Sequence, residues 1–261
     1  MTIKSEYMPF ASEIKDVIKH TDIEYTFRMC YNGKVKPGQF FEVSLPKYGE
    51  APISVSGIGD NTIDLTIRRV GRVTNEVFEH YIGDSLFIRG PYGNGFDVED
   101  YKGRELVIVA GGTGLSPVRG VADYFAGSGQ LKLIAGFKTP GDILFRDDFK
   151  LWKDKAEVIL TVDSGTESDD YRVGLVTEHL KDLKFKDISN AAAIVVGPPP
   201  MMKFTALGLL DIGFKPEQIW VSFERKMCCG IGKCGHCKIG DVYVCTDGPV
   251  FPYTKGRTLI D

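Results

Sequence analysis

The chain has 261 residues, of which 43% are hydrophobic and 26% charged, a balance typical of a soluble protein with one large domain or two modest ones. With 32 Lys and Arg against 35 Asp and Glu, the net charge is -3, so no overall basic field exists to attract nucleic acid or an anionic membrane. No run approaches the ~18 apolar residues of a spanning helix, and the N-terminus lacks the apolar core of a secretion signal, so we expect a cytoplasmic protein.

The first hundred residues read as short strands, several of them with alternating apolar residues, separated by Gly- and Pro-rich turns. The predicted strands cover residues 10–18, 24–29, 39–45, 52–57, 62–69 and 85–90. One short helix is expected over 74–81, with Thr74 as its cap. An antiparallel β-barrel fits this pattern best.

After residue 104 the pattern changes to buried apolar strands that alternate with helical segments. The expected strands are 105–110, 131–137, 156–162, 191–197 and 218–223, and the segments near 115–126, 142–152, 173–182 and 199–212 can be helical. This alternation indicates a doubly wound parallel α/β sheet. We therefore expect a barrel domain at 1–101, an α/β domain at 102–223 and a separate Cys-rich segment at 224–261.

Five of the six cysteines lie between residues 228 and 245. Cys229, Cys234, Cys237 and Cys245 form the expected ligand set, because the first three have the four-then-two spacing of plant-type iron-sulfur proteins. A zinc site is the alternative, although zinc sites commonly use two paired CxxC units and this segment has one. The neighbouring Cys228 is expected to be a free thiol, and His236 is an alternative ligand.

Two glycine-containing turns follow predicted strands and precede predicted helices. One contains Gly111, Gly112 and Gly114, and the other is GPPPMMKF at 197–204. Glycines at such a turn let a pyrophosphate approach a helix N-terminus, although each turn alone is equally explained as a tight connection. Both turns are expected at the carboxyl edge of the sheet, where dinucleotides bind.

Taken in order, the motifs APIS, RRVGRVT, GPYGNGF, VAGGTGLSP, GPPPMMKF and CGIGKCGHC closely resemble the ferredoxin-NADP reductase superfamily with an appended two-iron cluster. Within it, the sequence looks most like the electron-transfer (B) subunits of anaerobic sulfite reductases. The gamma subunits of sulfhydrogenases and the electron-transfer subunit of dihydroorotate dehydrogenase are close relatives. The resemblance implies FAD in the barrel, NAD(H) on the α/β domain and a [2Fe-2S] cluster on the C-terminal segment.

Matching these motifs by position implies the residues that contact each cofactor. The implied FAD residues are Pro52, Ile53, Ser54, Val55, Arg68, Val70, Val73 and Thr74, with Ser54 next to the flavin N5. The implied NAD residues are Gly111, Gly112, Thr113, Gly114, Pro117, Gly197, Pro198 and Met201. Many members of the superfamily have Arg where this chain has Ala51, which leaves the flavin phosphate to Arg68, Arg69 or Arg72.

The implied route runs from NADH through FAD and the cluster to a partner, because a flavin links a two-electron donor to a one-electron acceptor. The expected partners are a sirohaem subunit that reduces sulfite to sulfide and a further iron-sulfur subunit; the same role for a hydrogenase or a dihydroorotate dehydrogenase is the alternative. A non-catalytic, zinc-stabilised binding module is the alternative from another class. NADH is expected over NADPH, because Asp142 could bind ribose hydroxyls and Lys138 is the one cation nearby, although Asp142 is also explained as a helix cap.

Overall fold

The computed structural model describes residues 7–80 and 84–259. By its internal contacts the chain divides into two units, and each is described by itself. Unit 1 comprises residues 1–96 and 223–249, and unit 2 comprises residues 97–222 and 250–261. Within the described residues no helix is long and apolar enough to cross a membrane.

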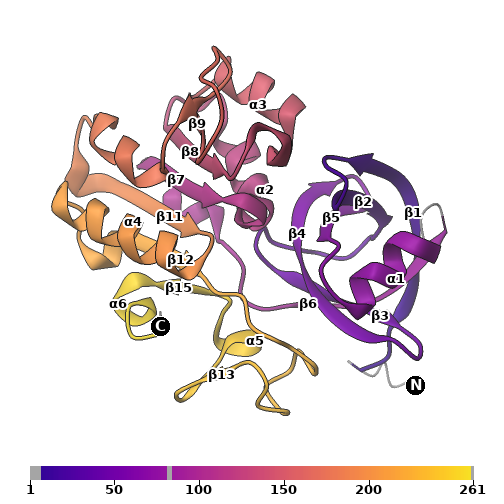
Figure 1. Ribbon diagram of the computed structural model, residues 1–261. Coiled ribbons are helices and arrows are strands. Elements are labelled where there is room, and N and C mark those ends of the chain that lie inside the picture. Colours follow the sequence, from indigo (N-terminus) through magenta and orange to yellow (C-terminus); the bar gives the residue numbers. More distant parts are fainter. Residues whose placement is uncertain (1–6, 81–83, 260–261) are drawn as a thin grey trace. The chain divides into compact units, whose positions relative to one another are not determined.

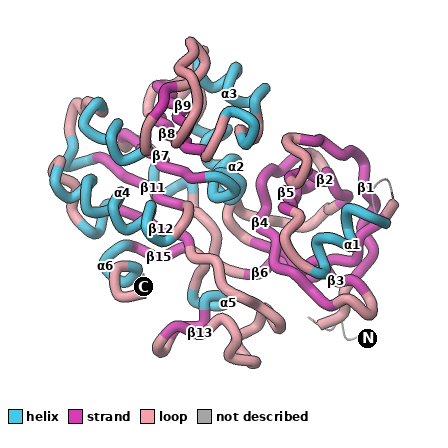
Figure 2. Tube along the Cα trace, in the orientation of Figure 1, coloured by secondary structure: helices cyan, strands magenta, loops and turns pink. Residues whose placement is uncertain are grey.

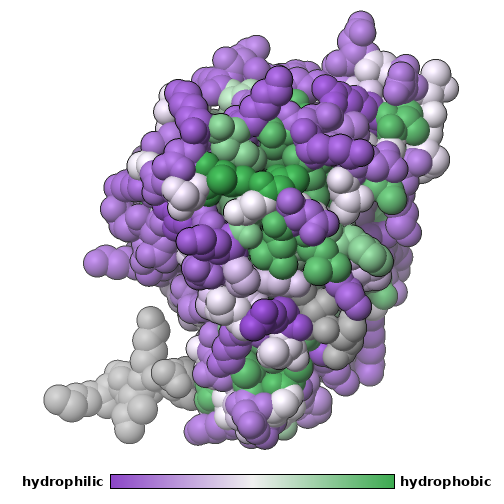
Figure 3. All heavy atoms as spheres, turned by 90° about the vertical axis from the view of Figure 1, so that its left-hand side faces the viewer, coloured by the Kyte–Doolittle hydropathy of each residue, from purple (hydrophilic) through white to green (hydrophobic). Residues whose placement is uncertain are grey.

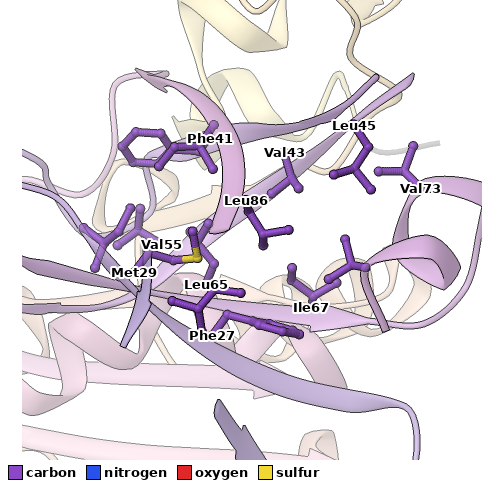
Figure 4. Close-up of a cluster of buried hydrophobic side chains, with 14 of the residues drawn as sticks. Phe27, Met29, Phe41, Val43, Leu45, Val55, Leu65, Ile67, Val73 and Leu86 are labelled. Atoms are coloured by element: carbon purple, nitrogen blue, oxygen red, sulfur yellow. The ribbon is translucent and has the colours of Figure 1, made fainter. Parts of the chain in front are cut away.

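Six antiparallel strands close into a barrel in unit 1, in the order β1-β2-β5-β4-β3-β6 (Figure 1). Their bounds are β1 Phe10–Lys19, β2 Glu24–Cys30, β3 Phe40–Leu45, β4 Gly49–Gly59, β5 Thr62–Arg68 and β6 Ser85–Tyr92. Alternate residues of each strand face inward, so the barrel fills with Val, Ile, Leu, Phe and Met side chains (Figure 4). The expected barrel is confirmed.

Helix α1 (Arg72–His80) follows β5 in unit 1 and begins two residues before the expected start. The expected cap, Thr74, is therefore inside the first turn. Its hydroxyl nevertheless accepts hydrogen bonds from the backbone N–H groups of Val70 and Gly71, at 3.0 and 2.9 Å. The Thr74 side chain, which lies in the first turn of α1, thus fixes the loop that precedes the helix.

Unit 2 contains a seven-stranded sheet in the order β10-β9-β8-β7-β11-β12-β15, parallel except for β15 (Figure 2). The strands are β7 Glu105–Gly111, β8 Leu131–Phe137, β9 Glu157–Val162, β10 Arg172–Val173, β11 Ala191–Val196, β12 Ile219–Ser222 and β15 Val250–Pro252. The helices are α2 Ser116–Phe125, α3 Arg146–Lys153, α4 Pro199–Asp211 and α6 Tyr253–Gly256. The expected parallel α/β sheet is confirmed.

The segment expected to be helical at 173–182 forms the end of β10 and then a 3₁₀ helix, Val176–Asp182, instead of an α-helix. Gly174 lies between them with φ +135°, a conformation that no α-helix contains. The Cys-rich segment also divides differently from the expected 224–261. Residues 223–249, with β13 Lys238–Ile239, β14 Val242–Tyr243 and α5 Val244–Asp247, pack in unit 1, whereas β15 and α6 complete unit 2.

Large apolar side chains also reach the surface of unit 2. Phe204 and Leu207 on α4 are 61% and 42% exposed. Figure 3 shows one side of the molecule, on which apolar areas lie among hydrophilic side chains.

Candidate functional site

Backbone N–H groups in the cysteine loop point at cysteine sulfurs. The amides of Lys233 and Cys234 donate to the Cys229 Sγ at 3.3 and 3.4 Å, and the amide of Gly232 donates to the Cys245 Sγ at 3.2 Å. Gly230, Gly232 and Gly235 have φ between +70° and +79°, which lets the loop wrap in this way. Such N–H donors stabilise the thiolates and sulfides of an iron-sulfur cluster.

The four cysteines of the expected ligand set all lie on the one loop that these N–H groups wrap. The sulfurs of Cys229 and Cys245 accept the backbone bonds. No three His, Cys, Asp or Glu side chains of the described residues converge on one point as ligands of a single ion. A two-iron cluster would share the four cysteines between its two irons.

The cysteines of this loop differ in exposure. Cys229, Cys237 and Cys245 are buried, whereas Cys234 and the adjacent Cys228 are exposed. Burial, aided by the hydrogen bond with Cys237, raises the pKa of Cys245 to about 12. A buried thiol of this kind becomes a thiolate only with a compensating positive charge, which a metal supplies.

The segment after β6 holds the cysteine loop. The Asn94 amide donates to the Gly248 carbonyl at 2.7 Å, and a Cβ on Gly93 would lie 2.5 Å from the Pro249 Cδ. A Cβ on Gly230 would lie 2.8 Å from the Tyr92 ring. GPYGNG at 90–95 is therefore a docking site for the loop, a role that its turn-forming residues did not reveal.

In β4, the expected flavin segment alternates between the barrel interior and its surface. Val55 is in the core and Ile53 packs against it, so their side chains support the strand. Pro52 and Ser54 are only partly buried, and the Ser54 hydroxyl has no hydrogen-bond partner among the described residues. A free hydroxyl on this strand fits the implied contact with a flavin.

Three arginines were candidates to neutralise the flavin phosphate in place of an arginine at residue 51. Arg68 pairs with Glu24 at 3.2 Å, and Arg69 pairs with Glu79 at 2.5 Å. Arg72 bonds the Lys47 carbonyl at 3.3 Å and, in the described part of the chain, has no carboxylate partner. Arg72 is therefore the best available cation.

The start of α1 also fits a diphosphate. The first turn contains no acidic residue, so the positive end of the helix dipole is uncompensated. Val70, just before the helix, is 71% exposed and offers an apolar surface for a ring system. Val73, by contrast, packs in the barrel core, so its side chain supports the site from behind.

The carboxyl end of β7 carries the first nucleotide turn. Gly112 has φ +55° and nothing within 4 Å of where its Cβ would be, which leaves open space for a ligand. Gly114 is instead required by packing, because its Cβ would lie 2.6 Å from the Val196 carbonyl oxygen. Thr113 beside them is partly exposed, whereas Pro117 is buried in the first turn of α2.

The second turn, after β11, meets the first. The Met201 sulfur lies where Cβ atoms on Gly111 and Gly197 would be, at 2.4 and 2.8 Å. Met201 therefore packs against both glycines, and Pro198 beside it is exposed. The register pairs β7 with β11 up to Ala110 and Val196, so both turns lie at the same sheet edge, as expected.

Ser116 is a candidate site residue that the sequence reasoning missed. It is the first residue of α2 and is 4% exposed, yet its hydroxyl has no partner among the described residues. A buried hydroxyl normally has a hydrogen-bond partner, so a ligand phosphate at this helix N-terminus would satisfy it. The hydroxyl residue between Leu115 and Pro117 was the signal available in the sequence.

The Asp142 carboxylate is already used as a helix cap. It accepts hydrogen bonds from the Thr139 amide and hydroxyl, at 3.0 and 2.6 Å. Asp163, directly after the adjacent β9, lies at the surface, and partial loss of hydration raises its pKa, with Lys138 opposing the shift. Asp163 is thus a second carboxylate at the same edge, which the sequence analysis did not single out.

Comparisons with known proteins agree with this geometry. Residues 108–206 match the oxidoreductase NAD-binding domain, and residues 224–255 match the iron-sulfur cluster binding domain of dihydroorotate dehydrogenase B. The chain is 38% identical to the sulfhydrogenase 2 subunit gamma of Pyrococcus furiosus, over 95% of this chain and 96% of that protein. The chain belongs to the family of these electron-transfer subunits.

Further relatives fall in the same family. A probable dihydroorotate dehydrogenase B electron transfer subunit of Pyrococcus furiosus is 36% identical over 90% of this chain and 85% of that protein. An NADH-dependent reduced ferredoxin-NADP oxidoreductase structure matches with a TM-score of 0.78 and 25% identity, over 94% of this chain and 88% of that one. The expected cofactors, FAD, NAD and an iron-sulfur cluster, are confirmed as those of this family.

Proposed function

We propose that the chain takes electrons from NADH and passes them through FAD and a [2Fe-2S] cluster to a partner subunit. The observation that carries this proposal is the cysteine loop, with its N–H groups aimed at the Cys229 and Cys245 sulfurs. Cys229, Cys234, Cys237 and Cys245 would hold the cluster. FAD, when bound, supplies the change from two-electron to one-electron transfer.

The residues of this chain bind and orient the cofactors, and no side chain has to break a bond. In the barrel, Ser54 would position the flavin and Arg72 with the start of α1 would neutralise its diphosphate. In unit 2, Gly112 and Ser116 would receive the NADH pyrophosphate, and Met201 would line the nicotinamide side. The ribose hydroxyls would contact Asp163 or the remaining oxygen of Asp142.

Electrons would leave through the exposed side of the cluster. Cys234 is the exposed ligand candidate, and Lys226, Lys233 and Lys238 around it are also exposed. These cations would steer an acidic surface of the partner. The exposed Phe204 and Leu207 are a further surface suited to a partner subunit.

For the partner, we propose a sirohaem subunit that reduces sulfite to sulfide, with a further iron-sulfur subunit between them. Sulfite reduction takes six electrons, whereas this chain would store about three, two on FAD and one on the cluster. The reduction itself therefore belongs to another subunit. A hydrogenase or a dihydroorotate dehydrogenase is the second candidate, because such subunits are among the relatives by name.

Reconstitution tests the choice of partner. The isolated chain is expected to reduce ferricyanide with NADH but to form no sulfide, and sulfide is expected once a candidate sirohaem subunit is added. Sulfide formed by the isolated chain would contradict the division of labour. If NADH-dependent activity appears only with a hydrogenase or dihydroorotate dehydrogenase subunit, the chain serves that kind of enzyme instead.

A further inference from the structure

Arg89 is a buried charge that the proposed route does not use. It lies in β6 of the barrel and is 2% exposed. Arginine is almost never fully buried unless its charge is paired and its donors are satisfied. Its partners therefore show what the side chain does.

All five N–H donors of the Arg89 guanidinium have acceptors. Nε and one Nη atom bond the two oxygens of Glu50, at 2.7 and 2.5 Å. The other Nη atom bonds the Tyr92 hydroxyl at 2.9 Å. The last two donors bond the carbonyl oxygens of Cys228 and Cys229, both at 2.6 Å.

Two of these bonds tie the barrel to the cysteine loop. Arg89 is 139 positions from Cys228 and 140 positions from Cys229 in the sequence, and all three residues belong to the same unit. They fix the backbone at Cys229, whose side chain would be the first ligand. Lysine cannot replace this arrangement, because it has three donors on one nitrogen instead of a planar fork.

We propose that Arg89 is a positioning residue for the iron-sulfur cluster, which anchors the backbone of the first cysteine ligand on the barrel and, with Glu50, sets the charge beside the cluster. This inference rests on the proposed function, since it takes Cys229 as a ligand. The Arg89–Glu50 pair is nearly neutral as a whole. Reduction adds a negative charge to the cluster, so the charge beside it helps to set the reduction potential.

The two roles of Arg89 predict different effects. In Arg89→Gln, the Glu50 carboxylate is left without its cation, so the cluster midpoint potential should fall. In Glu50→Gln, the arginine is left without its anion, so the potential should rise. In the double variant the charge is balanced again, and the potential should return toward the wild-type value while the anchoring of the loop stays lost.

The test is an EPR-monitored redox titration of the purified holoprotein, with iron content measured on the same samples. Arg28→Gln is the matched control, because Arg28 is also a barrel arginine in an ion pair, with Asp64 at 2.8 Å. We expect a lowered potential and reduced iron in Arg89→Gln, and wild-type values for both in Arg28→Gln.

An unchanged potential, EPR spectrum and iron content in Arg89→Gln would overturn the inference. Should that variant fail to fold, as judged by circular dichroism, Glu50→Gln decides: a raised potential supports the inference, and an unchanged one overturns it. A wild-type protein without a [2Fe-2S] signal would instead contradict the proposed function, and the inference with it.

Discussion

Cys228 and Cys229 are adjacent in the chain, but their environments differ. Cys229 is buried and its sulfur accepts two backbone N–H bonds, whereas Cys228 is exposed. Their carbonyls share the same anchor, Arg89, so the difference lies in the side chains. Of these two cysteines, Cys229 has the burial and the backbone N–H donors that are expected of a cluster ligand, and Cys228 does not.

Serine substitutions test the ligand set. Replacing Cys229, Cys234, Cys237 or Cys245 by serine should each remove most of the cluster iron, because the cluster needs four thiolates and we do not expect the exposed Cys228 to replace a missing one. Cys228→Ser and Cys30→Ser should retain it. Iron analysis and visible absorbance measure the outcome. Loss of the cluster in Cys228→Ser with retention in Cys229→Ser would show that the ligand register is incorrect.

Glu42 is a second buried charge in the barrel. It is 0% exposed, and neither carboxylate oxygen has a hydrogen-bond partner among the described residues. Burial raises its pKa from 4.5 to about 7, with Arg89 opposing the shift. The folded protein therefore binds the carboxyl proton of Glu42 more tightly than the unfolded chain does.

The sign of the pH effect follows from that difference. The contribution of the Glu42 carboxyl to the free energy of unfolding is complete below about pH 4.5 and is lost as the pH rises to about 7. The total loss is on the order of 3 kcal/mol. Glu42→Gln should remove this loss, so its Tm relative to wild type should rise between pH 4.5 and 7. A constant Tm difference for Glu42→Gln would contradict the raised pKa.

Among the elements, α2 begins at Ser116, and a substitution there distinguishes an effect on ligand binding from an effect on stability. Ser116→Ala removes a buried hydroxyl that has no partner within the described part of the chain, so stability should stay level or rise slightly. If the hydroxyl binds the NADH pyrophosphate, KM for NADH should rise about tenfold, equivalent to about 1.4 kcal/mol. Steady-state kinetics and thermal unfolding measure the two effects. A lower Tm with unchanged KM would indicate a structural role.

We expect the ends of β8 and β9 to set the nucleotide preference. Asp142 and Asp163 are carboxylates at this edge, and the cations beside them are Lys138 and Arg146, whose guanidinium bonds the Pro140 carbonyl. A carboxylate here would accept hydrogen bonds from the ribose hydroxyls of NADH and repel a 2′-phosphate. The kcat/KM for NADH should exceed that for NADPH. Asp163→Ala should reduce the difference more than Asp142→Ala, because the Asp142 carboxylate is held by Thr139. A clear preference for NADPH in the wild type would contradict the assignment.

Both sets of strands could be read from the sequence because their patterns are local. Alternation marks the barrel strands, and continuous apolar runs such as Ala191–Val196 mark the parallel ones. The hydrogen bonds from Arg89 to the carbonyls of Cys228 and Cys229 join residues that are far apart in the sequence, so no local sequence pattern predicts them. The same holds for β15, which joins the sheet only through its pairing with β12.

At the scale of the whole molecule, the loop 223–249 leaves the sheet after β12, packs in the barrel unit and returns to the sheet at β15. A separate C-terminal segment was expected, because the Cys- and Gly-rich composition differs from both neighbours. The contacts instead join this loop to the unit that would bind FAD. Flavin and cluster would thus be carried by one compact unit, which suits transfer between them.

If the chain works as proposed, NADH reduces a cluster that the chain itself holds. The most direct measurement is anaerobic addition of NADH to the purified protein, followed by EPR. We predict a [2Fe-2S] signal approaching one spin per chain, with bleaching of the flavin absorbance. A colourless protein that binds zinc, or a flavin that bleaches while no cluster signal develops, would contradict the account.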